Sequence, residues 1–356
     1  MFTNESIQLR EYFFPKITLQ DSIELKNIFQ HFEKIQLYPI KEKGIEYENK
    51  KKISIDAKGG ADQIINKTYL FKKSSFTFTI HKLNVSLTVY SLNKEDDLLL
   101  KLANLVSFVY SLDRVDIQYL SIDIYLVDQK KTISSSSELF TRNEINSGYC
   151  ITGKTPKIVI YRKEEIFKVL IHELIHAFQY DSYEDNSKLI QHYQSKYNIS
   201  SEKINSNEAY TEIWANIINC YLISKNIGRN RYNLFLILIA MEKEFSYFQA
   251  EKVIYLSKLN YDDKKQAVDI NMDTNVLAYF IIRSELYKGL NRFLRFCKNH
   301  NRNYIKIEND DLWLNHLKKN ELILRKNRRF NNINKNSYFF TSMRMTLNEL
   351  DIYAYT

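Results

Sequence analysis

Glycine, proline and cysteine are all scarce in this chain, which has 7, 3 and 3 of them among 356 residues. Glycine and proline together make up under 3% of the chain, where about 12% is usual, so collagen-like, linker-like and proline-rich disordered architectures are excluded. The hydrophobic share of 44% and the aromatic share of 14% suffice for a large buried core. The length predicts two lobes or one large domain, because single cores stop growing at about 250–300 residues.

The cysteines and the apolar runs exclude two further classes of protein. Cys150, Cys220 and Cys297 stand far apart, so they form neither a CxxC metal knuckle nor a disulfide framework, and we expect small core residues in a reducing compartment. The first residues lack the basic and apolar regions of a signal peptide. The longest apolar runs, such as 234–241, are well short of the ~18 residues that span a bilayer. These patterns predict a cytoplasmic protein without a membrane partner.

Positive charge is in excess, because 51 Lys and Arg against 42 Asp and Glu give a formal charge of +9. The densest basic run is 324–335, which we expect to be a solvated loop. Such an excess can serve a nucleic-acid or other anionic partner, but the sequence contains no recognised nucleic-acid motif. A basic face would also attract acidic peptide substrates. The sequence leaves the oligomeric state open.

Hydrophobic periodicity predicts an α+β chain with a mixed first half and a helical second half. Alternation predicts a hairpin over 75–92 and strands over 116–127 and 157–161. Helical spacing predicts helices over 21–37, 96–112, 163–180, 205–224, 232–248, 273–290 and 310–324. The Lys-rich stretch from 38 to about 60 and the Ser-rich stretch 132–138 are expected to be irregular.

One short motif carries chemistry: the segment KVLIHELIHAFQ places His172, Glu173 and His176 in the pattern HExxH. Two histidines four residues apart lie about 40° from each other around a helix, so both rings reach one metal ion from the same face. Glu173, about 100° from His172, can accept a proton from a metal-bound water. Because zinc lowers the pKa of such a water toward about 7, the pattern predicts a metal hydrolase.

The helix that carries this motif is apolar on nearly every side between Ile166 and Phe178, so it belongs in the protein interior. Burying two histidines and a carboxylate there without partners is costly, and a metal ion or hydrogen-bonding groups must satisfy them. The alternative interpretation is a pair of hydrogen-bonded core histidines beside a capped glutamate. The other histidines, His31, His81, His300 and His316, have no partner at metal-binding spacing.

A catalytic zinc ion needs a third protein ligand. In the metzincin pattern HExxHxxGxxH this ligand is a histidine, but Gln179 and Ser182 stand at the Gly and His positions, so that class is excluded. Further along, NEAYTE at 207–212 is similar to the NExxSD pattern of gluzincins. The rival third ligands are Asp181, Glu184 and His192.

With both motifs, the chain resembles the gluzincin-type zinc metallopeptidases. The resemblance implies one Zn²⁺ per chain, held by His172, His176 and Glu208. It implies that Glu173 is the general base and that Glu212 orients a ligating histidine. The stretches that carry the motifs are also similar to uncharacterised metallopeptidase-like proteins of large DNA viruses.

The resemblance covers 157–220 and implies a fold. A zincin-like catalytic core over 61–225, with a mixed sheet, a backing helix and the active-site helix, would follow an N-terminal helical or irregular extension over 1–60. A mainly helical lobe over 226–356 would complete the chain. The strand at 157–161 would be the edge strand that pairs with an extended substrate.

Three features depart from the family pattern or lie outside it. Glu212 is one methylene longer than the family's aspartate, and the 32-residue gap from His176 to Glu208 is long for a gluzincin. The polar insert at 182–206 is a candidate lid or specificity loop. No motif selects the residue that would hydrogen-bond the oxyanion. The candidates are Tyr279 and Tyr210.

Together these patterns predict a zinc-dependent peptidase that acts on a peptide or protein substrate. The alternative is a basic nucleic-acid-binding or protein-binding module on an inactive zincin fold. The sequence does not decide between cleavage within a chain and cleavage at its ends.

Overall fold

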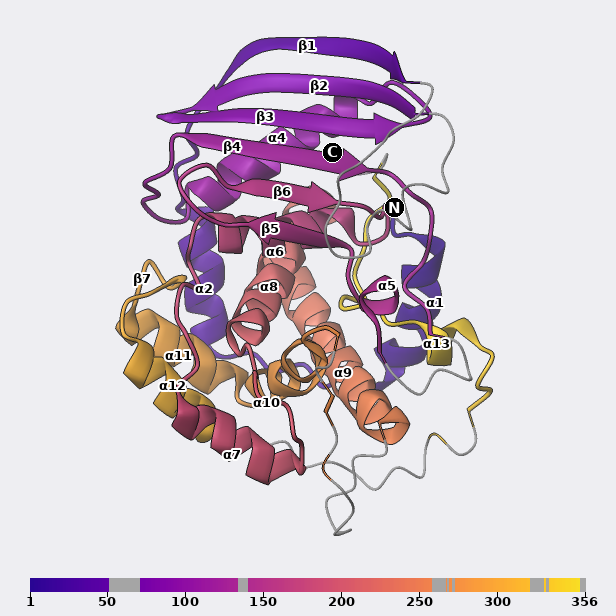
Figure 1. Ribbon diagram of the computed structural model, residues 1–356, viewed down its shortest axis with the longest axis vertical. Helices are drawn as coiled ribbons and strands as arrows, with labels where there is room; N and C mark the ends of the chain where they lie inside the picture. The colour runs from indigo at the N-terminus through magenta and orange to yellow at the C-terminus, as the bar shows by residue number, and fades with distance from the viewer. Residues whose placement is uncertain are drawn as a thin grey trace.

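A computed structural model describes residues 1–50, 71–133, 140–257, 267, 269–270, 273–320, 330 and 333–352. Its main feature is a six-stranded mixed sheet that lies at one end of the molecule, with helices packed beneath it (Figure 1). The predicted α+β class is confirmed at this level: the six strands of the main sheet fall in the first half of the chain and long helices dominate the second.

The sheet has the strand order β1-β2-β3-β4-β6-β5. β1 pairs antiparallel with β2 and β2 with β3, whereas β3, β4 and β6 run parallel and β5 is antiparallel to β6. The strands are β1 (Ile40–Lys50), β2 (Phe71–Ile80), β3 (Leu83–Ser91), β4 (Tyr119–Tyr125), β5 (Gly148–Ile151) and β6 (Lys157–Ile160). The predicted hairpin is thus found in β2 and β3.

Two strand predictions are wrong. β6 is not the edge strand, because β4 and β5 flank it; the edge strand is β5, whose four residues were too short a pattern to recognise. The stretch from 38 is not irregular, because β1 forms the opposite edge of the sheet, and 51–60 lies outside the described residues. The lysines and glutamates of β1 gave the stretch the composition of a loop, although charged residues are typical of sheet edges.

The helices form layers beneath one face of the sheet. α4 packs against β1, β2 and β3, and α6 packs against β5, β6 and α8. The longer helices are α1 (Asn4–Phe13), α2 (Ile23–Glu33), α4 (Asp96–Tyr110), α6 (Ile166–Ala177), α7 (Ser187–Tyr197), α8 (Asn207–Ile227), α9 (Arg231–Leu256), α11 (Leu290–His300) and α12 (Asp310–Lys318). The short elements are η1 (Phe14–Lys16), α5 (Arg142–Ile145), the π-helical turn η2 (Leu277–Ile282), α10 (Arg283–Lys288), α13 (Tyr338–Thr341) and the two-stranded sheet of β7 (Asn301–Arg302) and β8 (Lys306–Ile307).

Several helices differ from their predicted bounds. The predicted helix over 273–290 is broken into η2 and α10, and the polar insert at 182–206 contains α7. The end of the predicted helix over 310–324 and most of the predicted loop at 132–138 lie outside the described residues. α1 was not predicted; Thr3 caps its first turn by accepting a hydrogen bond from the backbone of Ser6.

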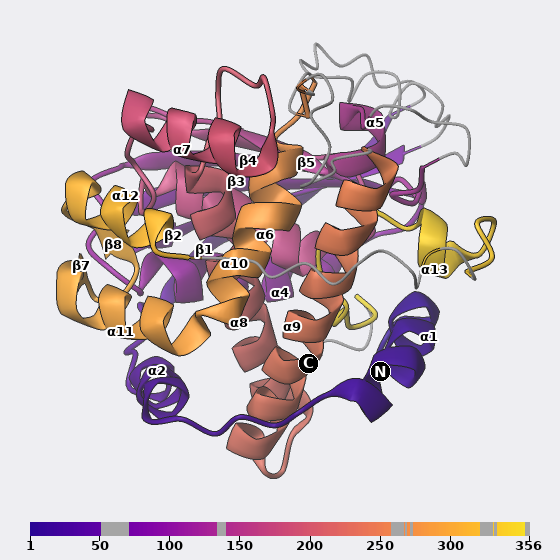
Figure 2. The same cartoon turned by 90° about the horizontal axis from the view of Figure 1, so that it is seen from below.

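Side chains from the sheet and from the helices on both sides of residue 225 belong to one hydrophobic cluster. α6 lies at its centre, between the sheet and α8 (Figure 2). The division into 1–60, 61–225 and 226–356 stays a prediction, because a shared core does not show which parts of the chain can fold alone. The burial of α6 agrees with its apolar sequence, since all but one of its residues are buried.

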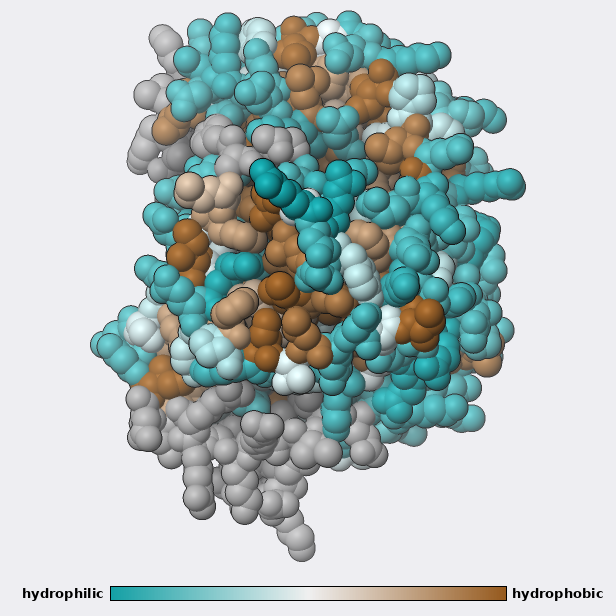
Figure 3. All heavy atoms as spheres, turned by 180° about the vertical axis from the view of Figure 1, so that it is seen from behind, coloured by the Kyte–Doolittle hydropathy of each residue, from teal (hydrophilic) through white to brown (hydrophobic). Residues whose placement is uncertain are grey.

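Hydrophilic side chains dominate the rim of the face opposite that of Figure 1, around a central group of hydrophobic ones (Figure 3). Within the described residues, no helix combines the length and the apolar character that a membrane span requires. The basic run at 324–335 lies mostly outside the described residues.

Candidate metal centre

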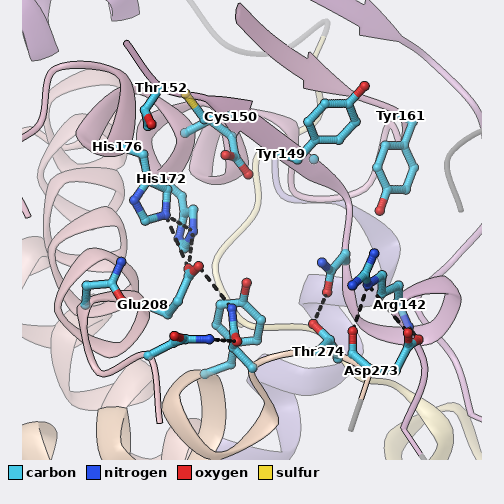
Figure 4. Close-up of a pocket in the computed structure, with 17 residues that line it drawn as sticks. Arg142, Tyr149, Cys150, Thr152, Tyr161, His172, His176, Glu208, Asp273 and Thr274 are labelled. Carbon is cyan, nitrogen blue, oxygen red and sulfur yellow. Dashed lines mark hydrogen bonds and ion pairs between the residues drawn. The ribbon is translucent and has the colours of Figure 1, made fainter. Parts of the chain in front are cut away.

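α6 and α8 bring three of the predicted ligands together. Nε2 of His172 and Nε2 of His176 lie 3.0 Å apart, and each is 3.2 Å from Oε2 of Glu208. Figure 4 shows the two rings and the carboxylate turned toward a common point. Among the described residues, this is the single group of three His, Cys, Asp or Glu side chains whose donor atoms meet closely enough for one metal ion.

The spacing of these three atoms fits a small divalent ion. Ligands at about 2.0–2.1 Å from a tetrahedral zinc ion lie about 3.3 Å from one another, close to the observed 3.0–3.2 Å. Two imidazole nitrogens and one carboxylate oxygen are also a donor set that zinc accepts. His172, His176 and Glu208 could therefore hold such an ion with one position left open.

Each histidine has a carboxylate behind it. Nδ1 of His172 lies 3.0 Å from Oε1 of Glu212, a short contact that is not aligned as a hydrogen bond, and Nδ1 of His176 lies 2.6 Å from Oδ2 of Asp181. Carboxylates in this position fix the tautomer and the orientation of a ligating imidazole. Glu212 thus lies where the resemblance implies.

Asp181 is not a third ligand but the partner of His176. α6 ends at Ala177, and Gln179 takes a left-handed backbone conformation with φ of 56°, which turns the chain back toward the helix. Thr211 donates a further hydrogen bond of 2.8 Å to Oδ2 of Asp181. The sequence could not show this, because no glycine or proline marks the end of the helix.

The second oxygen of Glu208 has its own partner. Asn275 donates a hydrogen bond of 3.1 Å to Oε1 of Glu208 and accepts one of 2.7 Å from Asn205. Because Oε1 is held in this way, Oε2 alone faces the two histidines. Neither asparagine was predicted, and no sequence pattern connects 205 with 275.

Glu212 is in turn held by two buried cations. Lys168 donates to Oε1 of Glu212, and Nη1 of Arg283 lies 3.3 Å from Oε2. The sequence offers a signal for Lys168, since it is a lysine in an otherwise apolar helix, one turn before His172. Arg283 comes from α10, and no pattern relates it to the motif.

Glu173 lies beside the three ligands without a polar partner of its own. Its residue is 5% exposed, and among the described residues none donates a hydrogen bond to its carboxylate. Burial raises the pKa of Glu173, and the charge of Glu208 adds to this, whereas the two histidines lower it. A β-carbon on Gly148 of β5 would come within 2.9 Å of the carbonyl oxygen of Val159 and within 3.2 Å of Oε1 of Glu173, so a larger residue there would force the neighbouring strand and the Glu173 carboxylate to shift.

The charges around the ligands shift their pKa values. Burial alone would lower the pKa of His176, but Asp181 and Glu208 raise it well above its usual value; Glu208 and Glu212 act on His172 in the same direction. Burial would raise the pKa of Glu208, but the two histidines hold it far below its usual value. The surrounding carboxylates thus favour positive charge at both imidazoles.

Around the two histidines, negatively charged side chains outnumber positively charged ones by two. Four carboxylates surround the two histidines and are met by the two cations Lys168 and Arg283. The carboxylates are those of Glu173, Asp181, Glu208 and Glu212. With neutral imidazoles the cluster carries a charge of −2, which one divalent metal ion neutralises.

A cavity of about 570 Å³ opens over these residues. In Figure 4 it extends from His172, His176 and Glu208 toward Arg142, Tyr161 and Asp273. β5 lines it with Gly148, Tyr149 and Cys150. A second cavity of about 330 Å³ shares Thr152, His176 and Asn207 with the first, so the cleft continues past His176.

The two candidate oxyanion residues lie in different places. Tyr279, on η2, lines the main cavity, and its ring centre is 6.1 Å from that of His172. Tyr210 instead donates to the carbonyl of Ile305, accepts a hydrogen bond from Asn301 and does not line the cavity. Tyr210 therefore takes the core role that the abundance of tyrosines also allows, because its position on α8 turns it into the core.

The rival ligands also lie apart from the three donor atoms. Glu184 lines the second cavity, and His192 lies on α7; neither belongs to the metal-binding group. Of the cysteines, Cys220 and Cys297 are buried as predicted, whereas Cys150 is half-buried and lines the main cavity.

Comparison with known proteins finds one partial relative. No protein-family model and no solved structure matches the chain. The protein described as "Uncharacterized protein R210" of Acanthamoeba polyphaga mimivirus is 27% identical over 138 residues. The match covers 35% of this chain and 34% of R210, so this chain spans about a third of the length of that relative. This match agrees with the expected similarity to proteins of large DNA viruses, but it does not bear on the resemblance to gluzincins and brings no activity with it.

Proposed function

We propose that this protein is a zinc-dependent metallopeptidase of the gluzincin type. One observation carries the proposal: Nε2 of His172, Nε2 of His176 and Oε2 of Glu208 converge within 3.2 Å of one another beside the buried carboxylate of Glu173. The alternative of hydrogen-bonded core histidines explains less, because it gives no role to the Glu173 carboxylate that lines the cavity beside them.

The fold supports a zincin-like catalytic core. The active-site helix α6 lies against a mixed sheet, α4 packs against the sheet and α6, and an antiparallel edge strand borders the cavity. These are the parts that the resemblance implies, with β5 in the place that the sequence assigned to β6. Glu208, the proposed third ligand, lies on a later helix, α8, which agrees with the NExxTE pattern.

A zinc ion held by His172, His176 and Glu208 would supply two effects: a lower pKa of a coordinated water and polarisation of the carbonyl of the scissile bond. The chain's own residues provide the proton transfers. Glu173 accepts a proton from the attacking water and passes it to the leaving amine, a role for which its raised pKa is suited. Glu212 and Asp181 keep both imidazoles with their Nε2 atoms toward the cavity.

Tyr279 is placed to stabilise the developing oxyanion. Burial raises the pKa of its phenol well above the usual value, and Glu208 and Glu173 raise it further. The hydroxyl therefore stays protonated and can donate a hydrogen bond when charge develops on the carbonyl oxygen. η2 is a π-helical turn, a local irregularity that is frequent at functional sites.

The cleft favours an extended substrate cut at an internal bond. β5 lies at the edge of the sheet, so within the described residues one side of its backbone has no strand partner and can pair with a peptide. The cavities extend to both sides of the ligands, toward Arg142 on one side and past His176 on the other. A peptide that follows β5 therefore has room on both sides of the reacting bond.

The decisive experiment is the variant Glu173→Gln. We expect it to keep one zinc ion per chain and to lose about 10²–10⁴-fold in kcat, as the removal of a general base does. The assay uses internally quenched peptides with both ends blocked, and metal content is measured on the same samples. Full activity of the variant would contradict the mechanism, and cleavage of free-ended peptides alone would contradict the internal-bond assignment. A wild-type chain that binds zinc without hydrolysis would be an inactive binding module.

A further inference from the structure

Two buried cationic side chains contact the carboxylate of Glu212, and the proposed reaction does not itself require them. The side chains of Lys168 and Glu212 are each 2% exposed, and that of Arg283 is fully buried. Lys168 comes from α6, one turn before His172, whereas Arg283 comes from α10. Two helices thus bring positive charges to a carboxylate that lies on a third helix, α8.

The contacts divide between the two carboxylate oxygens. Oε1 of Glu212 accepts a hydrogen bond from Lys168 and lies 3.0 Å from Nδ1 of His172. Oε2 lies 3.3 Å from Nη1 of Arg283. With a cation at each oxygen the carboxylate cannot rotate freely. The atom that faces His172 is therefore fixed.

Arg283 is itself anchored to the end of the chain. Its Nη1 donates a hydrogen bond of 2.6 Å to the carbonyl of Met345, which also accepts one of 3.3 Å from Asn216 of α8. The backbone N–H of Met345 donates to Glu165, at the start of α6. The segment around Met345 thus ties α10 to both helices that carry the ligands.

We propose that Lys168 and Arg283 are positioning residues that hold Glu212 in place and, through it, the imidazole of His172. The inference rests on the proposed function, because the orientation of His172 matters only if its Nε2 binds a metal ion. Partners of a ligating imidazole are worth about 10–100-fold in metal affinity. The two cations act one step further out, on that partner.

The sign of the effect separates positioning from simple charge balance. A positive charge near a cation site repels the metal ion, so its removal by itself strengthens metal binding. If Lys168 and Arg283 fix Glu212, their removal instead weakens binding. A merely structural ion pair changes stability and leaves metal affinity unaltered.

The test compares two buried lysines in the full-length chain. Lys168→Met removes a contact with Glu212, while the control Lys252→Met removes an equally buried amine that donates to the carbonyl of Ser342. Zinc dissociation constants are measured by competition with a chromophoric chelator, and Co²⁺-loaded samples report the geometry of the site. We expect Lys168→Met to weaken zinc binding, by less than the about 10–100-fold that loss of a direct imidazole partner costs, and to alter the Co²⁺ spectrum, and Lys252→Met to leave both unchanged.

A double-mutant cycle with Glu212→Gln locates the effect. The amide oxygen of glutamine can still face Nδ1 of His172, but it carries no charge for Lys168 to hold. We expect Lys168→Met to cost much less zinc affinity in the Glu212→Gln background than in wild type, because residues that act through one partner are not additive. Equal losses in both backgrounds would show that Lys168 does not act through Glu212.

Arg283 provides an independent pair of variants, which decide the matter if Lys168→Met does not fold. Arg283→Lys keeps a positive charge and is expected to retain zinc affinity better than Arg283→Gln. Unchanged or tighter zinc binding in Lys168→Met, or equal affinities in the two Arg283 variants, overturns the inference. The proposed function fails separately, if the wild-type chain itself neither binds zinc nor hydrolyses peptides.

Discussion

The molecule contains two groups of buried carboxylates that are satisfied in opposite ways. One group, here the terminal cluster, consists of Glu164, Glu165, Glu242 and Glu349 and holds the C-terminal segment at 342–350. The other, the site cluster, consists of the buried Glu173, Asp181 and Glu212 and the half-buried Glu208. Both lie in the interior, so burial alone does not distinguish them.

Backbone N–H groups satisfy the terminal cluster. Glu165 accepts hydrogen bonds from the N–H groups of Met345 and Thr346, and Glu242 accepts them from those of Leu347 and Asn348. Arg344 pairs with Glu349 at 2.7 Å. The hydrogen bonds and ion pairs of these carboxylates therefore hold one segment of backbone in place.

Side chains alone satisfy the site cluster. Among the described residues, no backbone N–H donates to its carboxylates, and Glu173 has no hydrogen-bond donor. Glu173 and Glu208 line the main cavity, and the cluster as a whole carries a formal excess of two negative charges. The difference is that backbone hydrogen bonds give the terminal cluster a structural role, whereas the unbalanced charge of the site cluster agrees with the proposed cation site.

The largest expected effect comes from removing a ligand of the site cluster. Wild type should bind one zinc ion per chain, and zinc at about 100 times its Kd should raise the free energy of unfolding by about 2.7 kcal/mol. Glu208→Ala should lose the metal, the hydrolysis and the zinc-dependent stabilisation together. Metal analysis beside thermal unfolding with and without a chelator measures all three; a variant that keeps one zinc ion would remove Glu208 as a ligand.

Removing an acceptor of the terminal cluster should have the opposite signature. Glu242→Ala leaves the buried N–H groups of Leu347 and Asn348 without their acceptor, at a cost of about 1–3 kcal/mol each. Urea unfolding should show this loss while the folded variant still binds one zinc ion per chain. Glu244→Ala, on the same helix but only half-buried, is the control and should change stability far less. If the folded Glu242→Ala variant no longer binds zinc, the two clusters do not have the separate roles described above.

The smallest effect concerns a cation beside the terminal cluster. Burial lowers the pKa of Lys252 to about 7, so between pH 7 and about 10.5 the folded chain binds fewer protons at this amine than the unfolded chain does. Its contribution to stability therefore rises with pH in that window, by about 2 kcal/mol from pH 7 to 9. The comparison of wild type with Lys252→Met by urea unfolding at both values isolates this slope. If the free energy of unfolding changes equally with pH in wild type and in Lys252→Met, the prediction is contradicted.

Much of the active-site helix follows from local sequence. The four-residue spacing of His172 and His176 on an apolar helix places both rings on one face, whatever the rest of the chain does. The pattern NEAYTE likewise places Glu208 and Glu212 on one face of α8. These relations need no long-range contact, because helical geometry fixes them.

Other parts of the site needed the folded chain. The edge strand was assigned to 157–161 instead of β5, because strand order depends on pairing that a single segment does not encode. Tyr210 and Tyr279 were equal candidates in sequence, and only packing turned the first into the core and the second toward the cavity.

The scarcity of glycine and proline, together with HExxH and NExxTE, determined two uninterrupted helices and the residues that they present on one face. The tertiary structure decided how the two helices meet and which groups stand behind the ligands. It placed Asp181, Lys168, Asn275 and Arg283 around the histidines and Glu208. The reason is physical: the helical repeat acts over four residues, whereas these partners come from turns and helices up to about a hundred residues away, brought together by burial of a shared core.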